Sequence, residues 1–261
     1  MRVIKVAPVS DIDKIVFIDA TRVAVRSWAK GPYRELPASL WDVLTGARVE
    51  PSLPGFATSK LGQFQSGEWF LGSVKDRSEV IAHHPATGQT VVEPVGGTVR
   101  SIALTPDRKT VLFSWHNSAT NESGYGSRTW SDAGAFGPGF EAPFVEGAGH
   151  DITPLPDGER FVTLGRYVIN PHLTVRSVAT GAIVASGGLA YFDLPAIAVS
   201  PDGQRVVAAM QLYLYVFPID DLKEEQVARN DGRKRFTGVA FHPSGRYLAA
   251  TSNDETVKLY D

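Results

Sequence analysis

The feature of this sequence that most constrains its fold is a strand–turn–strand unit that recurs along the chain. The unit is most complete at residues 236–261, where apolar residues flank a turn sequence at residues 242–246 (HPSGR). Proline restricts its own φ angle and glycine accepts a positive one, so these residues favour a tight reversal between two strands. A second polar turn at residues 252–255 precedes an alternating strand at residues 256–260. Such a unit cannot bury its own apolar face alone, which predicts a series of packed copies.

Two landmarks locate further copies of the unit. The first turn recurs as Pro-Asp pairs at residues 106–107, 156–157 and 201–202. The second landmark is a residue pair at the end of each third strand, and its first members are Trp41, His83, Trp130, Arg176, Phe217 and Tyr260. Successive positions are 41 to 47 residues apart, a regular spacing within the roughly 20–50 residues of repeat proteins. The sequence therefore predicts six copies that together account for the whole chain.

This pattern resembles the WD-repeat family. Its units have an apolar strand, a Ser-Pro-Asp-Gly-like turn, a second strand, an Asp-containing turn and a third strand that ends in Trp-Asp. Trp41-Asp42 followed by Thr45-Gly46 matches the end of such a unit, and Tyr260-Asp261 stands at the same place in the last copy. The resemblance implies an all-β fold, a six-bladed β-propeller formed by residues 1–261 as a single domain. Seven blades are commoner in the family, but six sets of landmarks are found and the length leaves no room for a seventh.

The first residues of the chain are expected to complete the last unit. A blade of this family has four strands, whereas the last copy stops at residue 261, after its third. Residues 2–7 alternate between polar and apolar side chains before Pro8. We expect this N-terminal strand to pair with the third strand of the C-terminal blade and so to close the propeller. Such pairing covers two sheet edges that would otherwise be exposed to aggregation.

Composition limits the place and the partners of the protein. Lys and Arg number 26 and Asp and Glu 28, for a net charge of −2, which gives no electrostatic support for nucleic-acid binding. The chain has no cysteine, so disulfides and cysteine-ligated zinc are excluded, and a reducing compartment fits. No secretory signal and no apolar run long enough to span a membrane is found. We expect a cytoplasmic protein, with a monomer favoured, that has no nucleic-acid or membrane partner.

The family resemblance also implies where a partner binds. Partners of WD propellers usually bind the rim formed by the loops that join strands b to c and by those that join strand d to the next strand a. Two b–c loops, at residues 29–39 and 116–128, are longer than the others, and residues 229–235 before the last unit are rich in arginine and lysine. The predicted partner-binding residues are Trp28, Tyr33, Arg34, Lys75, His116, Tyr125, Arg166, Arg233 and Arg235, and Gln211 and Asn253 hold equivalent b–c positions. The alternative is that these are ordinary solvated turn residues and tolerated insertions.

The family often has a buried hydrogen-bond network that links a His before strand a, a Ser or Thr on strand b, an Asp in the b–c turn and the Trp. Ser252 and Asp254 match the second and third members. Position 260 is Tyr, and Gly232 stands near the place of the His. The network is therefore incomplete in the last copy. We expect Asp254 to cap its own turn.

Catalytic signals are weak throughout the sequence. His83 and His84 are neighbours on a predicted strand, so their side chains point to opposite faces and do not readily share a metal. No nucleophile elbow, His-Glu-x-x-His motif or phosphate-binding loop is found. We predict a non-catalytic scaffold, without metal or cofactor, that binds a partner protein or peptide at the b–c loop face. The alternative is a propeller enzyme, hydrolase- or lactonase-like, or a small-ligand binder that uses the central channel. Apolar residues such as Ile102 and Val239 on the innermost strands favour an inert channel.

Overall fold

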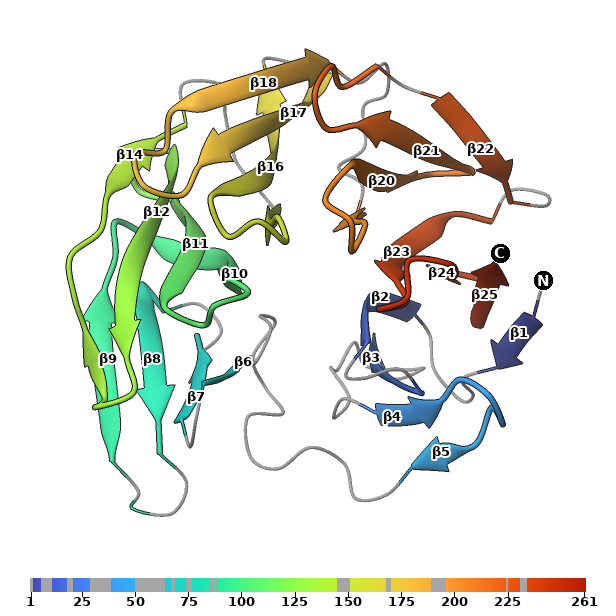
Figure 1. The fold of residues 1–261 in the computed structure, drawn as a ribbon, viewed down its shortest axis with the longest axis horizontal. Helices are drawn as coiled ribbons and strands as arrows, with labels where there is room; N and C mark the ends of the chain where they lie inside the picture. Colours follow the sequence, from blue (N-terminus) through green and yellow to red (C-terminus); the bar gives the residue numbers. More distant parts are fainter. Residues whose placement is uncertain are drawn as a thin grey trace. The chain divides into compact units, whose positions relative to one another are not determined.

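The fold was analysed in a computed structural model, which describes residues 2–5, 11–17, 21–28, 39–49, 64–66, 69–73, 77–84, 87, 89–144, 151–167, 170–188, 196–223, 225–230 and 234–261. Across these residues the chain forms strands joined by turns, and this described part contains no helix (Figure 1). The prediction of an all-β fold is therefore confirmed.

The described strands pair into six antiparallel sheets, of which five have four strands and one has five. Within a sheet, strands that follow one another in the chain pair with each other, except that β14 pairs with β12 and β1 pairs with β25. We letter the strands of each sheet a to d in this order. Because neighbouring strands are antiparallel, the a–b and c–d turns lie at one end of a sheet. The b–c turn and the connection to the next strand a lie at the other end.

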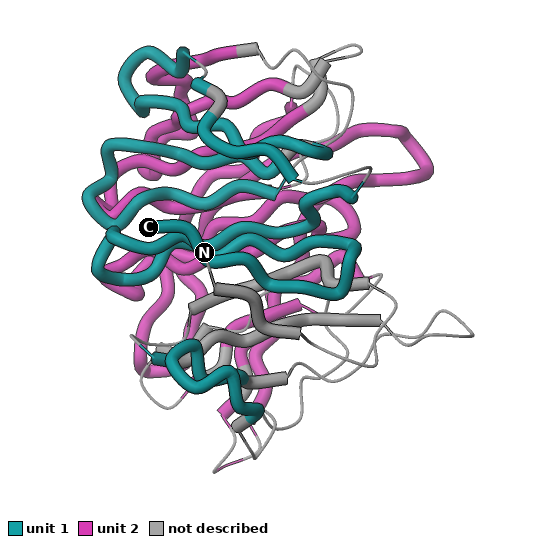
Figure 2. The backbone as a smooth tube through the Cα atoms, turned by 90° about the vertical axis from the view of Figure 1, so that its right-hand side faces the viewer, with its two compact units in different colours: residues 1–57, 195–261 teal, residues 58–194 magenta. Residues whose placement is uncertain are grey.

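The chain divides into two compact units, which Figure 2 shows in separate colours. Unit 1 comprises Met1–Ala57 and Pro195–Asp261 and contains three of the sheets. The C-terminal sheet of unit 1 lies between the other two, since its first strand contacts the first strand of each. The strands of unit 1 are β2 (Asp11–Phe17), β3 (Arg22–Trp28), β4 (Ser39–Asp42) and β5 (Arg48–Val49); β19 (Ala196–Val199), β20 (Arg205–Met210), β21 (Tyr213–Pro218) and β22 (Glu225–Arg229); and, in the C-terminal sheet, β23 (Phe236–Phe241), β24 (Leu248–Ser252), β25 (Thr256–Tyr260) and β1 (Arg2–Lys5).

Unit 2 comprises Thr58–Leu194 and contains the other three sheets. Its middle sheet begins with β10, which contacts both the preceding and the following sheet. The strands of unit 2 are β6 (Phe64–Ser66), β7 (Trp69–Gly72), β8 (Glu79–His83) and β9 (Thr90–Pro94); β10 (Thr98–Leu104), β11 (Thr110–Asn117), β12 (Glu122–Ser131), β13 (Ala135–Phe136) and β14 (Glu141–Pro143); and β15 (Asp151–Pro154), β16 (Arg160–Tyr167), β17 (Asn170–Ser177) and β18 (Ile183–Gly188).

The buried core of each unit lies between neighbouring sheets. In unit 1, Leu214 packs with Phe236 and Val239 between the β19–β22 sheet and the C-terminal sheet. In unit 2, Phe113 and Trp130 pack with apolar residues of the β6–β9 sheet. In these described cores, apolar side chains of one sheet are buried against those of a neighbour, as expected for a repeat whose single copy has too small a core.

The a–b turns form where the Pro-Asp pairs predict them, at residues 106–108, 156–159 and 201–204. Asp107, Asp157 and Asp202 each accept a hydrogen bond from the backbone N–H two residues further along the chain, at 2.9 to 3.0 Å. The aspartate side chain therefore closes its own turn. Because this interaction is local, the Pro-Asp pair predicts the turn from sequence alone.

Strands from the two ends of the chain pair in the C-terminal sheet. β1 lies antiparallel to β25, with Arg2 opposite Leu259 and Lys5 opposite Thr256. β25 also pairs with β24 on its other side, so that β1 is the fourth strand of this sheet. The outer edge of β25 is therefore covered by residues from the beginning of the sequence.

The prediction of a long b–c loop at residues 116–128 is wrong. β11 continues to Asn117 and β12 begins at Glu122, so the turn between them is short. The polar, glycine-rich sequence packs against aromatic rings of the facing strand. Gly124 lies opposite Trp115, and a Cβ atom on Gly124 would lie 2.4 Å from that indole. The glycines therefore permit close strand packing here, although a polar, glycine-rich sequence is typical of a loop. The other predicted long loop lies outside the described residues, apart from Ser39 in β4.

Candidate functional site

Several predicted partner-binding residues have no described side chain. Tyr33, Arg34, Lys75 and Arg233 lie outside the described residues. Trp28 is the last residue of β3 and Arg166 lies near the end of β16, so the backbone of each reaches the b–c end of its sheet. Their side chains are outside the described part.

Tyr125 is buried, which corrects its prediction as a contact residue. Its side chain is 5% exposed and packs against Phe144, with ring centroids 4.8 Å apart. Its hydroxyl donates a hydrogen bond of 3.0 Å to the carbonyl of Gly181 and accepts one of 2.6 Å from Arg176. The guanidinium of Arg176 lies 4.4 Å from the centre of the Tyr125 ring. Tyr125 therefore joins the β10–β14 sheet to the β15–β18 sheet within unit 2 and is not available to a partner.

His116 lies at the b–c end of the β10–β14 sheet. It is half-buried, and its Nδ1 is 2.8 Å from the hydroxyl of Ser123 on the facing strand. The neighbouring Asn117 accepts hydrogen bonds from the backbone N–H groups of Ala119 and Thr120, at 3.0 and 3.4 Å. The turn is therefore held by its own side chains, with the imidazole beside it.

A second group of predicted residues comes together in unit 1. Asn253, in the b–c turn of the C-terminal sheet, accepts a hydrogen bond of 2.8 Å from the backbone N–H of Arg235. The backbone N–H of Asn253 donates a hydrogen bond of 3.0 Å to the carbonyl of Arg235 in return. The carbonyl of Gln211, in the b–c turn of the β19–β22 sheet, accepts one of 2.6 Å from Phe236. We call Gln211, Arg235 and Asn253 the polar edge of unit 1.

The polar edge presents side chains from a fixed backbone. The side chains of Arg235 and Asn253 are exposed and that of Gln211 is half-buried. Because Arg235 is hydrogen-bonded through both of its backbone groups, little further backbone freedom is lost when a partner engages its side chain. An exposed cation and two amides suit hydrogen bonding to carbonyl or carboxylate groups of another chain.

A buried polar network lies beneath the polar edge. Asn230 donates a hydrogen bond of 2.9 Å to the hydroxyl of Ser252 and accepts one from the ammonium group of Lys258. Lys258 also forms an ion pair of 3.3 Å with Asp254. Asp254 accepts hydrogen bonds from the backbone N–H and the hydroxyl of Thr256. The expectation that Asp254 caps its own turn is therefore confirmed.

Two members of this network, Asn230 and Lys258, are not predicted from the sequence. Asn230 precedes strand a of the C-terminal sheet and takes the place that a His has in the family network. Lys258 lies on β25, and its side chain is buried and donates a hydrogen bond to Asn230. Burial would raise the pKa of Asp254. Side-chain hydrogen bonds with Thr256 and Ser252, together with the positive charge of Lys258, outweigh that effect and lower its pKa. Asp254 is therefore held as a carboxylate in the b–c turn that carries Asn253.

Comparison with protein-family models identifies the C-terminal segment. The model described as "WD domain, G-beta repeat" (WD40) matches residues 226–261. The C-terminal segment is therefore similar to a WD40 repeat. The match includes strands β23 to β25, the buried network and the Arg235–Asn253 pair. It supports the assignment of the chain to the WD-repeat family, and the antiparallel sheets of both units fit a WD40 β-propeller. A search of curated proteins finds no match to the chain.

The WD40 repeat suggests a general role in protein interaction, and domains of this type are generally non-catalytic scaffolds. They typically bind protein partners. Among the described residues, no three His, Asp or Glu side chains come together as a group able to hold a metal ion. The same residues include no helix of the length and apolar character needed to cross a membrane.

Proposed function

We propose that the protein is a non-catalytic scaffold that binds a partner protein or peptide at the b–c ends of its sheets. The contact surface includes the polar edge of unit 1 and His116. Trp28, Tyr33, Arg34, Lys75, Arg166 and Arg233 remain predicted members of this surface. The general interaction role of WD40 domains supports the proposal, and so does the placement of exposed polar side chains on hydrogen-bonded turns.

The proposed architecture is a single domain that forms a six-bladed propeller closed by the N-terminal strand. Six sheets in the described residues and the pairing of β1 with β25 support it. A blade that contains strands from both chain ends makes the scaffold one cooperative unit, because neither end can separate without exposing a sheet edge.

The observation that carries the binding proposal is the reciprocal pair of hydrogen bonds between Arg235 and Asn253. Arg235 comes from the connection that enters the last sheet, and Asn253 comes from the b–c turn of that sheet. Both belong to the matched repeat. The pair therefore joins the two kinds of loop from which the proposed surface is built.

A comparative capture experiment tests this proposal. The immobilised full-length protein is incubated with lysate, and bound proteins are quantified by mass spectrometry for the wild type and for a His116→Ala/Arg235→Ala variant. The control, Arg205→Ala/His242→Ala, removes the same residue types at a–b ends, since Arg205 begins β20 and His242 follows β23. We expect at least one protein to bind the wild type and the control but to be depleted about tenfold on the test variant. Equal capture by all three proteins contradicts the proposed surface.

A further inference from the structure

A β-bulge recurs near the b–c end of the first strand in three sheets. The pairing register skips one residue in each of β2, β10 and β23, and these residues are Asp13, Arg100 and Thr237. A bulge adds an unpaired residue to one strand and redirects its side chain, and bulges are common next to functional sites. The three residues therefore hold equivalent positions, close to the b–c surface proposed above.

The bulge residue of the C-terminal sheet is bonded within the fold. Thr237 is half-buried, and its hydroxyl lies 3.0 Å from that of Thr251 on the neighbouring strand. The equivalent pair in the middle sheet of unit 2 is Arg100 and Ser114. Ser114 is fully buried, and its hydroxyl has no hydrogen-bond partner in the described part of the chain. Arg100 thus leaves a buried hydroxyl unsatisfied where threonine can satisfy it, and positions that give up stability in this way are often functional.

The charge of Arg100 is not neutralised by a partner within the described residues. Its side chain is exposed and forms no ion pair or hydrogen bond there. Of the acids near this end of the sheet, Glu79 forms an ion pair of 3.7 Å with Arg77. A carboxylate oxygen of Asp151 accepts a hydrogen bond of 3.0 Å from the buried Ser101. Neither carboxylate is paired with Arg100, so its guanidinium can bind an anion from another chain.

His116 provides a second group at the same place. It lies on β11 opposite Thr98, two residues before Arg100. Diagonal neighbours in a strand pair are about 7–8 Å apart, which is within the reach of a long side chain. The Nδ1 atom of His116 is 2.8 Å from the Ser123 hydroxyl, and Nε2 has no partner among the described residues. When the hydroxyl donates to Nδ1, Nε2 carries the proton and donates to a ligand.

We propose that Arg100 and His116 bind the carboxylate of an aspartate or glutamate side chain in the partner peptide. A guanidinium presents N–H groups in a fork that matches the two oxygens of a carboxylate, and the imidazole adds a further donor. The inference rests on the proposed function, because His116 belongs to the proposed b–c surface. It adds Arg100 to that surface and requires an acidic residue in the partner.

A peptide array tests this inference with the full-length protein. The probes are short peptides of random sequence with blocked ends, each matched by a copy in which Gln and Asn replace Glu and Asp. We expect the wild type to bind a set of acidic peptides at least about tenfold more tightly than their amide copies. An array on which no peptide binds, or on which the amide copies bind equally well, overturns the inference.

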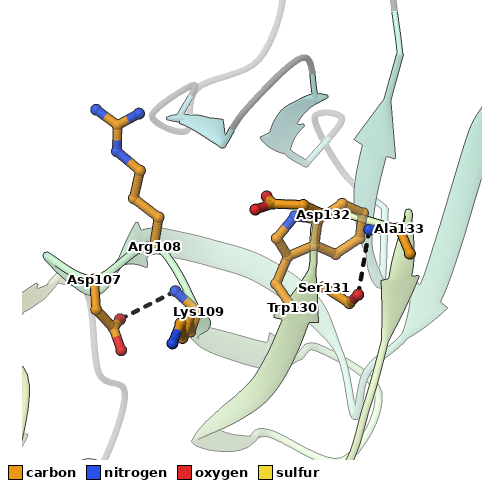
Figure 3. Close-up of a pocket in the computed structure, with 7 residues that line it drawn as sticks. All are labelled: Asp107, Arg108, Lys109, Trp130, Ser131, Asp132 and Ala133. Atoms are coloured by element: carbon orange, nitrogen blue, oxygen red, sulfur yellow. Dashed lines mark hydrogen bonds between the residues drawn. The ribbon is translucent and has the colours of Figure 1, made fainter.

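Three variants locate the contact on the protein. Arg100→Thr introduces the bulge residue of the C-terminal sheet, so its melting temperature should be unchanged or higher while it binds the acidic peptides at least about tenfold more weakly. Arg100→Lys keeps the charge without the fork and should lose less affinity. The control Lys109→Gln removes a charge from the opposite end of this sheet, where Lys109 lines the pocket in Figure 3, and should bind like the wild type. Wild-type binding by Arg100→Thr, or equal losses in Arg100→Thr and Lys109→Gln, contradicts the proposed contact.

The His116→Ala/Arg235→Ala variant separates this inference from the proposed function. Peptides that bind this variant weakly, but bind Arg100→Thr as tightly as the wild type, would support the b–c surface and overturn the role of Arg100. Peptides that bind both proteins weakly support the carboxylate contact.

Discussion

The guanidinium of Arg176 donates a 2.6 Å hydrogen bond to the hydroxyl of Tyr125 and lies over the ring of the same residue. Arg176 stands where the repeat pattern has tryptophan. A cationic side chain therefore replaces the aromatic one at this position, and it stacks on the aromatic ring of Tyr125.

Removing the Tyr125 hydroxyl is expected to destabilise the protein. Tyr125→Phe keeps the ring but takes an acceptor from the buried Arg176 and a donor from the carbonyl of Gly181. Arg176 and the carbonyl of Gly181 keep their own hydrogen bond of 3.2 Å, so the loss should be about 0.5–1.5 kcal/mol, the net contribution of a hydrogen bond. Urea unfolding measures this loss. The control is Tyr247→Phe at a side chain that is 38% exposed, and it should change the free energy of unfolding by less than about 0.5 kcal/mol. Equal effects of the two substitutions argue against the buried contact.

Arg108→Gly is expected to raise stability. Glycine removes the cost of a left-handed backbone conformation, about 1 kcal/mol, which corresponds to a rise of about 2–4 °C in the melting temperature for a chain of this size. Gly203→Arg is the reverse change in the related turn, where φ is 69°, and it should lower the melting temperature by a similar amount. Calorimetry of both variants checks the sign. A lower melting temperature in Arg108→Gly means that the arginine side chain stabilises the fold more than its backbone strains it.

Gly124→Ala is expected to disturb the packing of β11 against β12. The new Cβ would lie 2.4 Å from the Trp115 ring and 2.7 Å from the carbonyl oxygen of Ala142. Overpacking of this kind costs about 1–3 kcal/mol. The control is Gly165→Ala, because a Cβ at Gly165 meets no atom within 4 Å, and its effect should stay within about 1 kcal/mol. Urea unfolding measures both free energies of unfolding. A larger loss for Gly124→Ala supports close packing of β11 against β12, and equal small losses contradict it.

Two turn aspartates predict a loss of stability in acid. A hydrogen bond from the Thr105 hydroxyl lowers the pKa of Asp107, and one from the Ser200 hydroxyl lowers that of Asp202. A carboxyl whose pKa is lower in the folded state stabilises the fold above its unfolded pKa of about 3.9, and this contribution is lost as the pH falls through the folded value. The free energy of unfolding should therefore fall below about pH 4.

An Asp107→Asn/Asp202→Asn variant tests the source of this acid sensitivity. The asparagines can still accept hydrogen bonds in the turns but do not titrate. Denaturant unfolding between pH 5 and pH 3 should therefore show a smaller loss of stability for the variant than for the wild type. The same loss in both proteins would assign the acid sensitivity to other carboxyl groups.

The strand–turn chemistry was predictable because it is local. Asp157 and Gly158 specify their turn through one side-chain acceptor and one positive φ, and both effects act within a few residues. The buried contacts were not predictable, because they depend on residues of other strands. Gly124 reads as a loop residue until the facing Trp115 is known, and Lys258 reads as an exposed strand residue until Asn230 is placed beside it.

The candidate site was predictable to a similar degree. Arg235 and Asn253 were assigned to loops at one end of the sheet from the order of the strands, and the structure places them in hydrogen-bonding contact. Tyr125 was misassigned because its burial depends on Arg176, about fifty residues further along the chain. Arg108 at a glycine position is visible once the turns are aligned.

Removal of the N-terminal strand is expected to weaken the whole fold. Deletion of residues 1–8 exposes the edge of β25, which pairs with β1. Because unpaired strand edges promote association, the deletion should lower the melting temperature and increase aggregation. Thermal melts and light scattering measure both effects. A truncated protein that melts and scatters like the wild type would show that the first strand is dispensable.

A designed disulfide tests the pairing of the chain ends most directly. The sequence has no cysteine, and Arg2 lies opposite Leu259, within the Cα separation of about 4.5–5.5 Å that antiparallel partners have and that a disulfide requires. Arg2→Cys/Leu259→Cys should form an intramolecular disulfide on oxidation, whereas the out-of-register control Lys5→Cys/Leu259→Cys should not. Mass spectrometry after thiol alkylation measures disulfide formation in both variants. Free thiols or only intermolecular cross-links in the first variant would contradict a propeller closed by its own N-terminus.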